Sequence, residues 1–176
     1  MEKELEVKKR IRSSDVIAYG DGSICGKTGG YAYVILEGKR TTPDKYLRVF
    51  NEFNEQVKET TSNRMEIQAM LGALEFLILA HRKKELKFKN IYFFSDSKYT
   101  VNSTRWCYRW FAEEDMTKKN LDLWEKYVEL KRELDYMDIT TNIKWVKGHA
   151  GHIWNEHVDR LAKEASNKKI EKEIIN

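Results

Sequence analysis

Two apolar runs that each end in an aspartate constrain the fold of this chain most. Residues 16–21 (Val-Ile-Ala-Tyr-Gly-Asp) and residues 91–96 (Ile-Tyr-Phe-Phe-Ser-Asp) carry no charge before the final carboxylate. Short runs rich in β-branched and aromatic residues are typical of strands buried on both faces of a sheet. Gly22 and Ser23 follow Asp21, so we predict that the first strand stops in a turn there. An ionised aspartate at such a strand end is costly to bury unless a cation or hydrogen-bond donors meet it.

The remaining periodicity predicts an α/β fold with a five-stranded mixed sheet and flanking helices. We predict the second and third strands at residues 31–36 and 46–53, so that the first three strands form a meander. A tight glycine-rich turn at residues 25–30 joins the first two strands, which makes them antiparallel. A helix that is apolar nearly all round begins at Asn63 and ends at the basic segment 82–89. The later elements are a fifth strand over residues 140–146 and helices over residues 97–112, 120–137 and 154–170. The order βββαβααβα places helices on both faces of one sheet.

The length and composition describe one domain of ordinary size. The 176 residues are 41% hydrophobic and 34% charged, and no apolar run approaches the roughly 20 residues that span a bilayer. We expect a charged N-terminal extension over residues 1–14, one domain over residues 15–170 and a tail over residues 171–176. The N-terminus lacks the apolar core of a signal peptide, and Cys25 and Cys107 have no metal-ligand spacing, so we expect an intracellular, cytoplasmic protein. A net charge of +4 admits a nucleic-acid partner without requiring one.

Four acidic residues, called the four acids below, stand at distinctive positions: Asp21, Glu66, Asp96 and Asp159. Each has an ordinary structural interpretation. Glu66 is a capping-box partner if Asn63 is the N-cap of its helix, and Asp96 caps the helix that follows it. Asp21 fits an Asp-Gly turn, and Asp159 fits a surface charge on the last helix. The local sequence leaves these alternatives open.

Taken together, the four acids indicate a divalent-metal site. Neighbouring strand ends and a helix start bring several carboxylates into one patch, where their repulsion destabilises the fold unless cations bind. Oxygen ligands without cysteine favour Mg²⁺ or Mn²⁺ over Zn²⁺. Two such ions about 4 Å apart can activate a water and stabilise a leaving oxygen in phosphodiester hydrolysis. His149, on a glycine-flanked loop, is a candidate proton shuttle or product-release residue, and the alternative is an exposed histidine with no task.

At four places the sequence resembles ribonuclease H of type 1, with the motifs in the family's order between about Val16 and Ala165. The motifs are residues 19–23 (Tyr-Gly-Asp-Gly-Ser), 61–69 (Thr-Ser-Asn-Arg-Met-Glu-Ile-Gln-Ala), 94–99 (Phe-Ser-Asp-Ser-Lys-Tyr) and 145–162 (Trp-Val-Lys-Gly-His-Ala-Gly-His-Ile-Trp-Asn-Glu-His-Val-Asp-Arg-Leu-Ala). The resemblance implies the ribonuclease H-like fold. It also implies two-Mg²⁺ cleavage, with Mn²⁺ as an alternative metal, of the RNA strand of an RNA–DNA hybrid, leaving 5′-phosphate and 3′-hydroxyl ends. By motif position the four acids are metal ligands and His149 is an auxiliary catalytic residue. The resemblance also implies a monomer, and the lack of a long apolar run leads us to expect no association with membranes.

The resemblance further implies a set of substrate contacts. Thr61 and Asn120 match positions that hold a DNA phosphate in relatives, and Asn63 matches a position that contacts the RNA strand. Contacts to the 2′-hydroxyl distinguish RNA from DNA. Trp106 and Trp110 are four residues apart, hence on one helix face, and match the aromatic pair that lines the DNA channel. Trp110 has an alternative interpretation as a core residue.

The segment between Trp110 and Asn120 departs from many bacterial relatives, which carry a lysine-rich handle there. This chain has the shorter residues 111–119 (Phe-Ala-Glu-Glu-Asp-Met-Thr-Lys-Lys), so we predict modest affinity for the hybrid and a steep dependence on salt. Two alternatives to a hybrid-specific endoribonuclease are a catalytically silent nucleic-acid-binding module of the same fold and another nuclease of the superfamily. The four acids and the histidine argue against the silent module, and the Gly-His-Ala-Gly-His loop fits other nucleases poorly.

Overall fold

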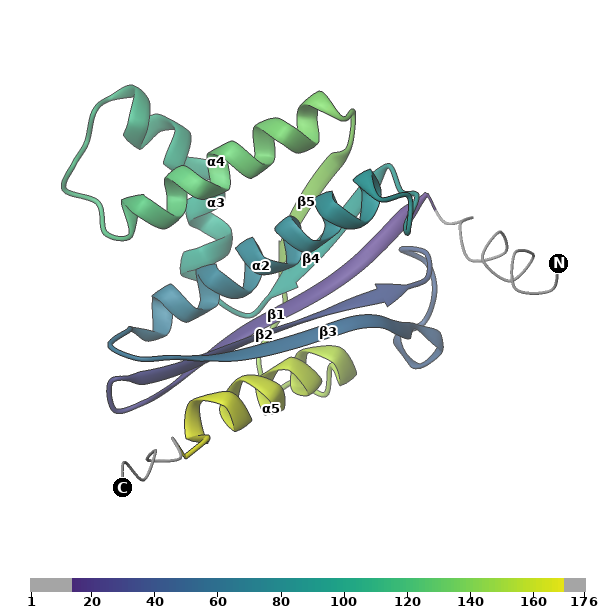
Figure 1. The fold of residues 1–176 in the computed structure, drawn as a ribbon, viewed down its shortest axis with the longest axis horizontal. Coiled ribbons are helices and arrows are strands. Elements are labelled where there is room, and N and C mark those ends of the chain that lie inside the picture. Colours follow the sequence, from purple (N-terminus) through teal and green to yellow (C-terminus); the bar gives the residue numbers. More distant parts are fainter. Residues whose placement is uncertain (1–13, 170–176) are drawn as a thin grey trace, which may run out of the picture.

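A five-stranded mixed sheet in the order β3-β2-β1-β4-β5 runs through residues 14–169, the part of the chain that the computed structural model describes (Figure 1). The strands are β1 (Asp15–Cys25), β2 (Thr28–Glu37), β3 (Arg48–Val57), β4 (Asn90–Ser95) and β5 (Thr140–Trp145). The helices are α2 (Ser62–Arg82), α3 (Lys98–Ala112), α4 (Leu121–Tyr136) and α5 (Ile153–Asn167), with a short 3₁₀ turn, η1 (Asp44–Tyr46), before β3. The predicted α/β class and the order βββαβααβα are confirmed.

The central strand β1 is longer than the sequence suggested. It pairs with β2 in antiparallel fashion, and with β4 in parallel only from Asp15 opposite Asn90 to Tyr19 opposite Phe94. The expectation that this strand stops in a turn after Asp21 is wrong, because β1 continues to Cys25. Pairing with β2 keeps this stretch extended, which rules out the local Asp-Gly turn. Asp21 instead lies just beyond the last β1–β4 pair.

The two faces of the sheet are covered by different helices. Helix α2 covers one face, with α3 and α4 on the same side, and α5 covers the other (Figure 1). Side chains of β1 alternate between the two cores: Val16 and Ala18 join the larger core with Trp124, whereas Ile17 and Tyr19 join the core beneath α5. The central strand is therefore buried on both faces, as its unbroken apolar run predicts.

Other boundaries differ from the sequence expectations by a few residues. The third strand begins at Arg48 instead of residue 46, because η1 occupies the chain immediately before it. Helix α5 ends at Asn167, and residues 1–13 of the expected extension and the tail at 170–176 lie outside the described residues. No helix in the described part of the chain is long and apolar enough to cross a membrane.

Candidate active site

Three carboxylates from three elements meet where β4 ends beside the central strand β1. Asp21 belongs to β1, Glu66 lies near the start of α2 and Asp96 directly follows β4. One oxygen from each of these side chains lies within 4.8 Å of the other two oxygens, and we call these residues the acidic triad. The parallel pairing of β1 with β4 produces this convergence, because Tyr19 is opposite Phe94 and each aspartate follows two residues later.

Neither Glu66 nor Asp96 caps a helix. The N-caps of α2 and α3 are Thr61 and Ser97, and each side chain accepts a hydrogen bond from the backbone N–H three residues on, at 3.3 and 3.1 Å. The two capping interpretations are therefore wrong, including Asn63 as the N-cap. Hydroxyl caps leave both carboxylates available to face Asp21.

The contact between α2 and β1 brings Glu66 to Asp21, and it depends on Gly22. A Cβ atom at position 22 would lie 2.6 Å from the backbone nitrogen of Glu66 and 2.6 Å from the backbone carbonyl carbon of Met65. Both atoms are main chain and cannot rotate away, so a larger residue would push the helix off the strand. The glycine after the aspartate thus sets the distance between two members of the acidic triad.

Burial makes two members of the acidic triad, Asp21 and Glu66, hold protons more tightly than isolated carboxylates do. Burial raises the pKa of Asp21 to about 7, and the Asp96 carboxylate adds to this rise, while hydrogen bonds from Glu66 and the Gly22 backbone N–H oppose it. Burial, together with the Asp21 charge, also raises the pKa of Glu66 well above its usual range. Buried carboxylates with raised pKa values favour a compensating positive charge beside them.

Asp159 adjoins the acidic triad from the opposite face of the sheet. Its carboxylate on α5 is 25% exposed, and Lys163, one helical turn later, donates to its Oδ2 atom at 2.8 Å. A side-chain hydrogen bond with Asp159 also contributes to the raised pKa of Asp21. The fourth acid therefore reaches the site while its side chain stays partly exposed and paired with Lys163.

His149 lies at the rim of the site in the loop between β5 and α5. Its side chain is exposed and its backbone φ is 54°, in the left-handed region that few non-glycine residues adopt. The preceding residue, Gly148, packs against the site: a Cβ atom there would lie 2.9 Å from the Oδ2 atom of Asp96. The loop thus places His149 directly after a residue that packs against Asp96 of the acidic triad.

Arg64 connects two of the residues expected to contact a DNA phosphate. Its backbone N–H donates to Thr61, and its guanidinium donates to the Oδ1 atom of Asn120 at 3.3 Å. The same guanidinium forms two bonds to Asp122, at 3.0 and 2.7 Å. The structure therefore brings Thr61 and Asn120 together, and Asn63 lies exposed in the first turn of α2 beside them.

The two tryptophans of α3 lie in different environments. The side chain of Trp106 is 52% exposed, so it is accessible to a partner. Trp110 is partly buried and packs against the larger core, and the Lys118 ammonium lies 5.5 Å from the centre of its ring. Packing of Trp110 agrees with its alternative interpretation as a core residue.

Two site residues escaped the sequence expectations, namely Arg64 and Asn155. Arg64 lies within the motif at residues 61–69, and its position between two expected site residues was the available signal. The Nδ2 atom of Asn155 donates to the Oδ2 atom of Asp96 at 3.3 Å. The sequence could have indicated Asn155 because it lies four residues before Asp159, which places both residues on one face of α5.

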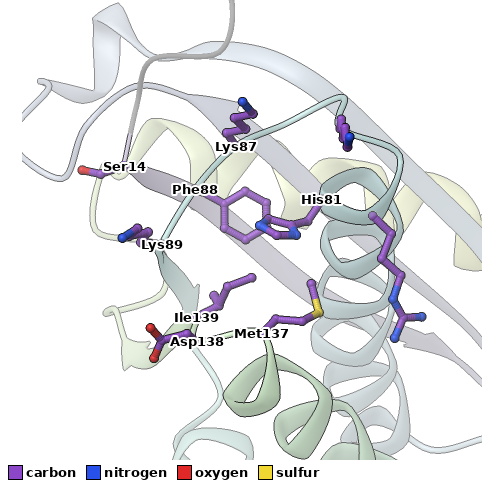
Figure 2. A pocket seen from close by; sticks show the side chains of 10 residues that line it. Ser14, His81, Lys87, Phe88, Lys89, Met137, Asp138 and Ile139 are labelled. Atoms are coloured by element: carbon purple, nitrogen blue, oxygen red, sulfur yellow. The ribbon is translucent and has the colours of Figure 1, made fainter.

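A cavity of about 1020 Å³ lies away from the acidic triad, and Figure 2 shows the residues that line it. Its lining includes His81 near the end of α2, Phe88 before β4 and Met137 after α4. Glu66 and His81 are separated by about 22 Å along the helix axis, from the rise of 1.5 Å per residue. No member of the acidic triad lines this cavity. The candidate site is therefore identified by the three carboxylates that lie close together, and not by the presence of a cavity.

Comparison with known proteins identifies the family. The family model for RNase H matches residues 13–167. The chain is 33% identical over 168 residues to ribonuclease H of Trichodesmium erythraeum, covering 89% of this chain and 92% of the relative. It is 33% identical over 155 residues to ribonuclease HI of Campylobacter jejuni, covering 85% and 90% respectively. Its fold is similar to that of LC11-RNase H1, crystallised in complex with an RNA/DNA hybrid, with a TM-score of 0.60, 22% identity and coverage of 86% of this chain and 96% of that one. The chain therefore belongs to the ribonuclease H family, whose members hydrolyse RNA–DNA hybrids.

Proposed function

We propose that this protein is an endoribonuclease that cleaves the RNA strand of RNA–DNA hybrids with two divalent cations and leaves 5′-phosphate and 3′-hydroxyl ends. The observation that carries the proposal is the convergence of Asp21, Glu66 and Asp96 within 4.8 Å. Membership of the ribonuclease H family supports the reaction. The hybrid bound in the crystals of LC11-RNase H1 supports the choice of substrate.

The residues around the acidic triad fit Mg²⁺ or Mn²⁺. Carboxylate oxygens are the ligands that such hard cations prefer. Two buried acceptors, Glu66 Oε2 and Asn155 Oδ1, have no hydrogen-bond partner among the described residues, and a hydrated cation would satisfy both. We assign Asp21, Glu66, Asp96 and Asp159 as the ligands. When bound, the ions activate a water and stabilise the leaving oxygen.

The other residues of the site would place the hybrid and move protons. His149 is exposed at the rim, where an imidazole nitrogen can take up or deliver a proton at the reacting phosphate. Thr61 and Asn120, held together through Arg64, would hold a phosphate of the DNA strand. Asn63 would contact the RNA strand, where the 2′-hydroxyl distinguishes RNA from DNA. The exposed face of Trp106 would line the DNA strand.

A gel assay with labelled substrates tests this proposal. An RNA–DNA hybrid, an RNA duplex and a DNA duplex are incubated with the protein, with Mg²⁺ and with a chelator. We expect cleavage of the hybrid alone, only with metal, to products with 5′-phosphate ends. Asp21→Asn and Asp96→Asn should lower the rate by at least about a hundredfold, because each removes one ligand charge.

A control substitution separates the site from general charge effects. Glu85 is exposed in the loop that follows α2, and Glu85→Gln neutralises a carboxylate there without touching the acidic triad. This variant should cleave at the wild-type rate. A wild-type protein that binds the hybrid in Mg²⁺ and leaves it intact would instead establish the silent binding module.

A further inference from the structure

Asn155 is a buried polar side chain in contact with the acidic triad. It is 2% exposed and lies in the first turn of α5. Its amide nitrogen Nδ2 donates to the Oδ2 atom of Asp96 at 3.3 Å. This bond joins the helix beneath the sheet to the carboxylate that follows β4, two elements that are far apart in the sequence.

The orientation of this amide follows from its neighbour. A carboxylate accepts hydrogen bonds and does not donate them when ionised, so the amide nitrogen, and not the amide oxygen, must face Asp96. The other end of the amide, Oδ1, is then buried and has no donor among residues 14–169. A buried amide oxygen without a donor costs free energy, which indicates a missing partner such as a water or a hydrated cation.

Asp96 needs support from outside its own strand. Its backbone carbonyl accepts a hydrogen bond from the Trp145 indole at 3.0 Å, which fixes the main chain but not the carboxylate. On one side the carboxylate is limited by Gly148, where a Cβ atom would approach Oδ2 to 2.9 Å. On another side it meets Asn155, whose bond sets the rotation of the carboxylate.

We propose that Asn155 is a positioning residue that orients the Asp96 carboxylate for metal binding and offers its free Oδ1 to a water at the site. This inference rests on the proposed metal site and adds to it a residue outside the four acids. Partners that orient metal ligands typically change metal affinity or activity by 10- to 100-fold when removed. Asn155 acts through Asp96, and this role requires no contact with the reacting phosphate.

The test measures Mg²⁺ and Mn²⁺ binding to the full chain without nucleic acid, by isothermal titration calorimetry. Asn155→Ala should weaken binding by about tenfold or more, because the Asp96 carboxylate is free to rotate. In cleavage assays the Mg²⁺ concentration for half-maximal rate should rise in parallel. The KM for the hybrid at saturating Mg²⁺ should stay within about twofold of wild type, since the substrate contacts are intact.

Asn142→Ala is the matched control. Asn142 also uses its side-chain amide to join two elements, donating to the backbone carbonyl of Ile91 at 3.1 Å, away from the acidic triad. Its loss should change thermal stability and leave metal affinity unchanged. If Asn155→Ala does not fold by circular dichroism, Asn155→Ser, with a shorter side chain in the same place, is measured instead.

The possible outcomes separate the two proposals. Wild-type metal affinity in a folded Asn155 variant overturns the positioning role, and so does an equal loss in Asn142→Ala. If the wild-type protein itself neither binds the cations nor cleaves the hybrid, the proposed function fails first. A weakened Asn155 variant beside an unchanged Asn142 variant supports both.

Discussion

Asp21 shows at the scale of one residue how the fold sets up the chemistry. It is 3% exposed, and its carboxylate meets those of Glu66, Asp96 and Asp159. Burial lifts its pKa from 3.8 to about 7, so the ionised form required for metal binding is the costly form in the metal-free protein. The site is therefore a local source of instability that a bound cation would offset.

The raised pKa of Asp21 predicts an inverted pH dependence of stability. Between the unfolded pKa of 3.8 and the folded pKa of about 7, the folded state holds more protons than the unfolded state. Stability in a chelator should therefore fall as pH rises through this window, by a few kcal/mol at most, since one pKa unit is about 1.4 kcal/mol. Thermal unfolding at about pH 5 and about pH 8 measures the change.

Two further measurements isolate the carboxylate. Mg²⁺ should restore stability at the higher pH, because binding to the folded state alone stabilises it. Asp21→Asn should flatten the pH dependence and raise the metal-free melting temperature at that pH. A pH profile of Asp21→Asn as steep as that of the wild type would assign the effect to other groups.

The environments of Trp106 and Trp110 predict different consequences of substitution. Trp106→Ala should weaken hybrid binding by about tenfold, the scale of one aromatic contact with a nucleotide, with little change in stability. Trp110→Ala should lower the free energy of unfolding by about 2–4 kcal/mol, because the side chain packs against the larger core. Fluorescence anisotropy with a labelled hybrid and thermal unfolding report the two quantities. Equal losses of hybrid binding in the two variants would instead support the expectation that both tryptophans line the DNA channel.

At the scale of elements, the site depends on how closely α2 packs on β1. The strand contributes Asp21 and the helix contributes Glu66, and Gly22 allows the observed approach because a Cβ atom there would lie 2.6 Å from main-chain atoms of α2. The parallel β1–β4 pairing brings Asp96, and α5 brings Asp159 from the other face. Four elements thus each supply one carboxylate.

Gly22→Ala tests this packing. The added methyl group meets main-chain atoms of α2 at 2.6 Å, so we expect a loss of about 1–3 kcal/mol in stability and weaker metal binding. Gly26→Ala is the control, since Gly26 has a φ of 65° and open space around its Cβ position. It should cost about 1 kcal/mol through backbone strain and leave metal affinity unchanged. The same metal affinity in both variants would argue against the helix–strand distance as the determinant.

At the scale of the whole molecule, the sheet carries helices on both faces (Figure 1). The acidic triad lies where β4 ends beside the central strand β1. The net charge of +4 is small for a protein that binds a polyanion. The segment after α3 contains Glu113, Glu114 and Asp115, and Arg109 is already paired with Glu113 at 2.7 Å. These carboxylates offset the positive charge of Lys118 and Lys119, which follow in the same segment.

We expect hybrid affinity to be modest and to fall steeply with salt. Each neutralised phosphate should cost about 3.5-fold in affinity when salt rises fourfold. Glu114→Lys should strengthen binding severalfold at low salt, and Glu85→Lys, in the loop after α2, should strengthen it less. Fluorescence anisotropy titrations at two salt concentrations measure the affinity of each variant for the hybrid and its dependence on salt. Binding that is unchanged between low and high salt would contradict an electrostatic contact.

Much of the fold was predictable because apolar periodicity reports burial directly. The runs ending at Asp21 and Asp96 identified two buried strands, and the long apolar helix and the meander were placed to within a few residues. The end of β1 was not predictable, because pairing with β2 overrides the local turn preference of Asp-Gly. The helix caps were misassigned because Thr61 and Ser97 compete with neighbouring polar residues that are equally suited to the position.

The sequence by itself determined which residue types are present, the order of the elements and the resemblance to the family, since these depend on local pattern and motif spacing. Only the tertiary structure decided which side chains meet. Gly22 as the close contact between β1 and α2, Trp110 as a packed residue and Asn155 as the partner of Asp96 all follow from distances between elements remote in sequence. Those distances come from strand pairing and helix packing, which no local pattern of residues encodes.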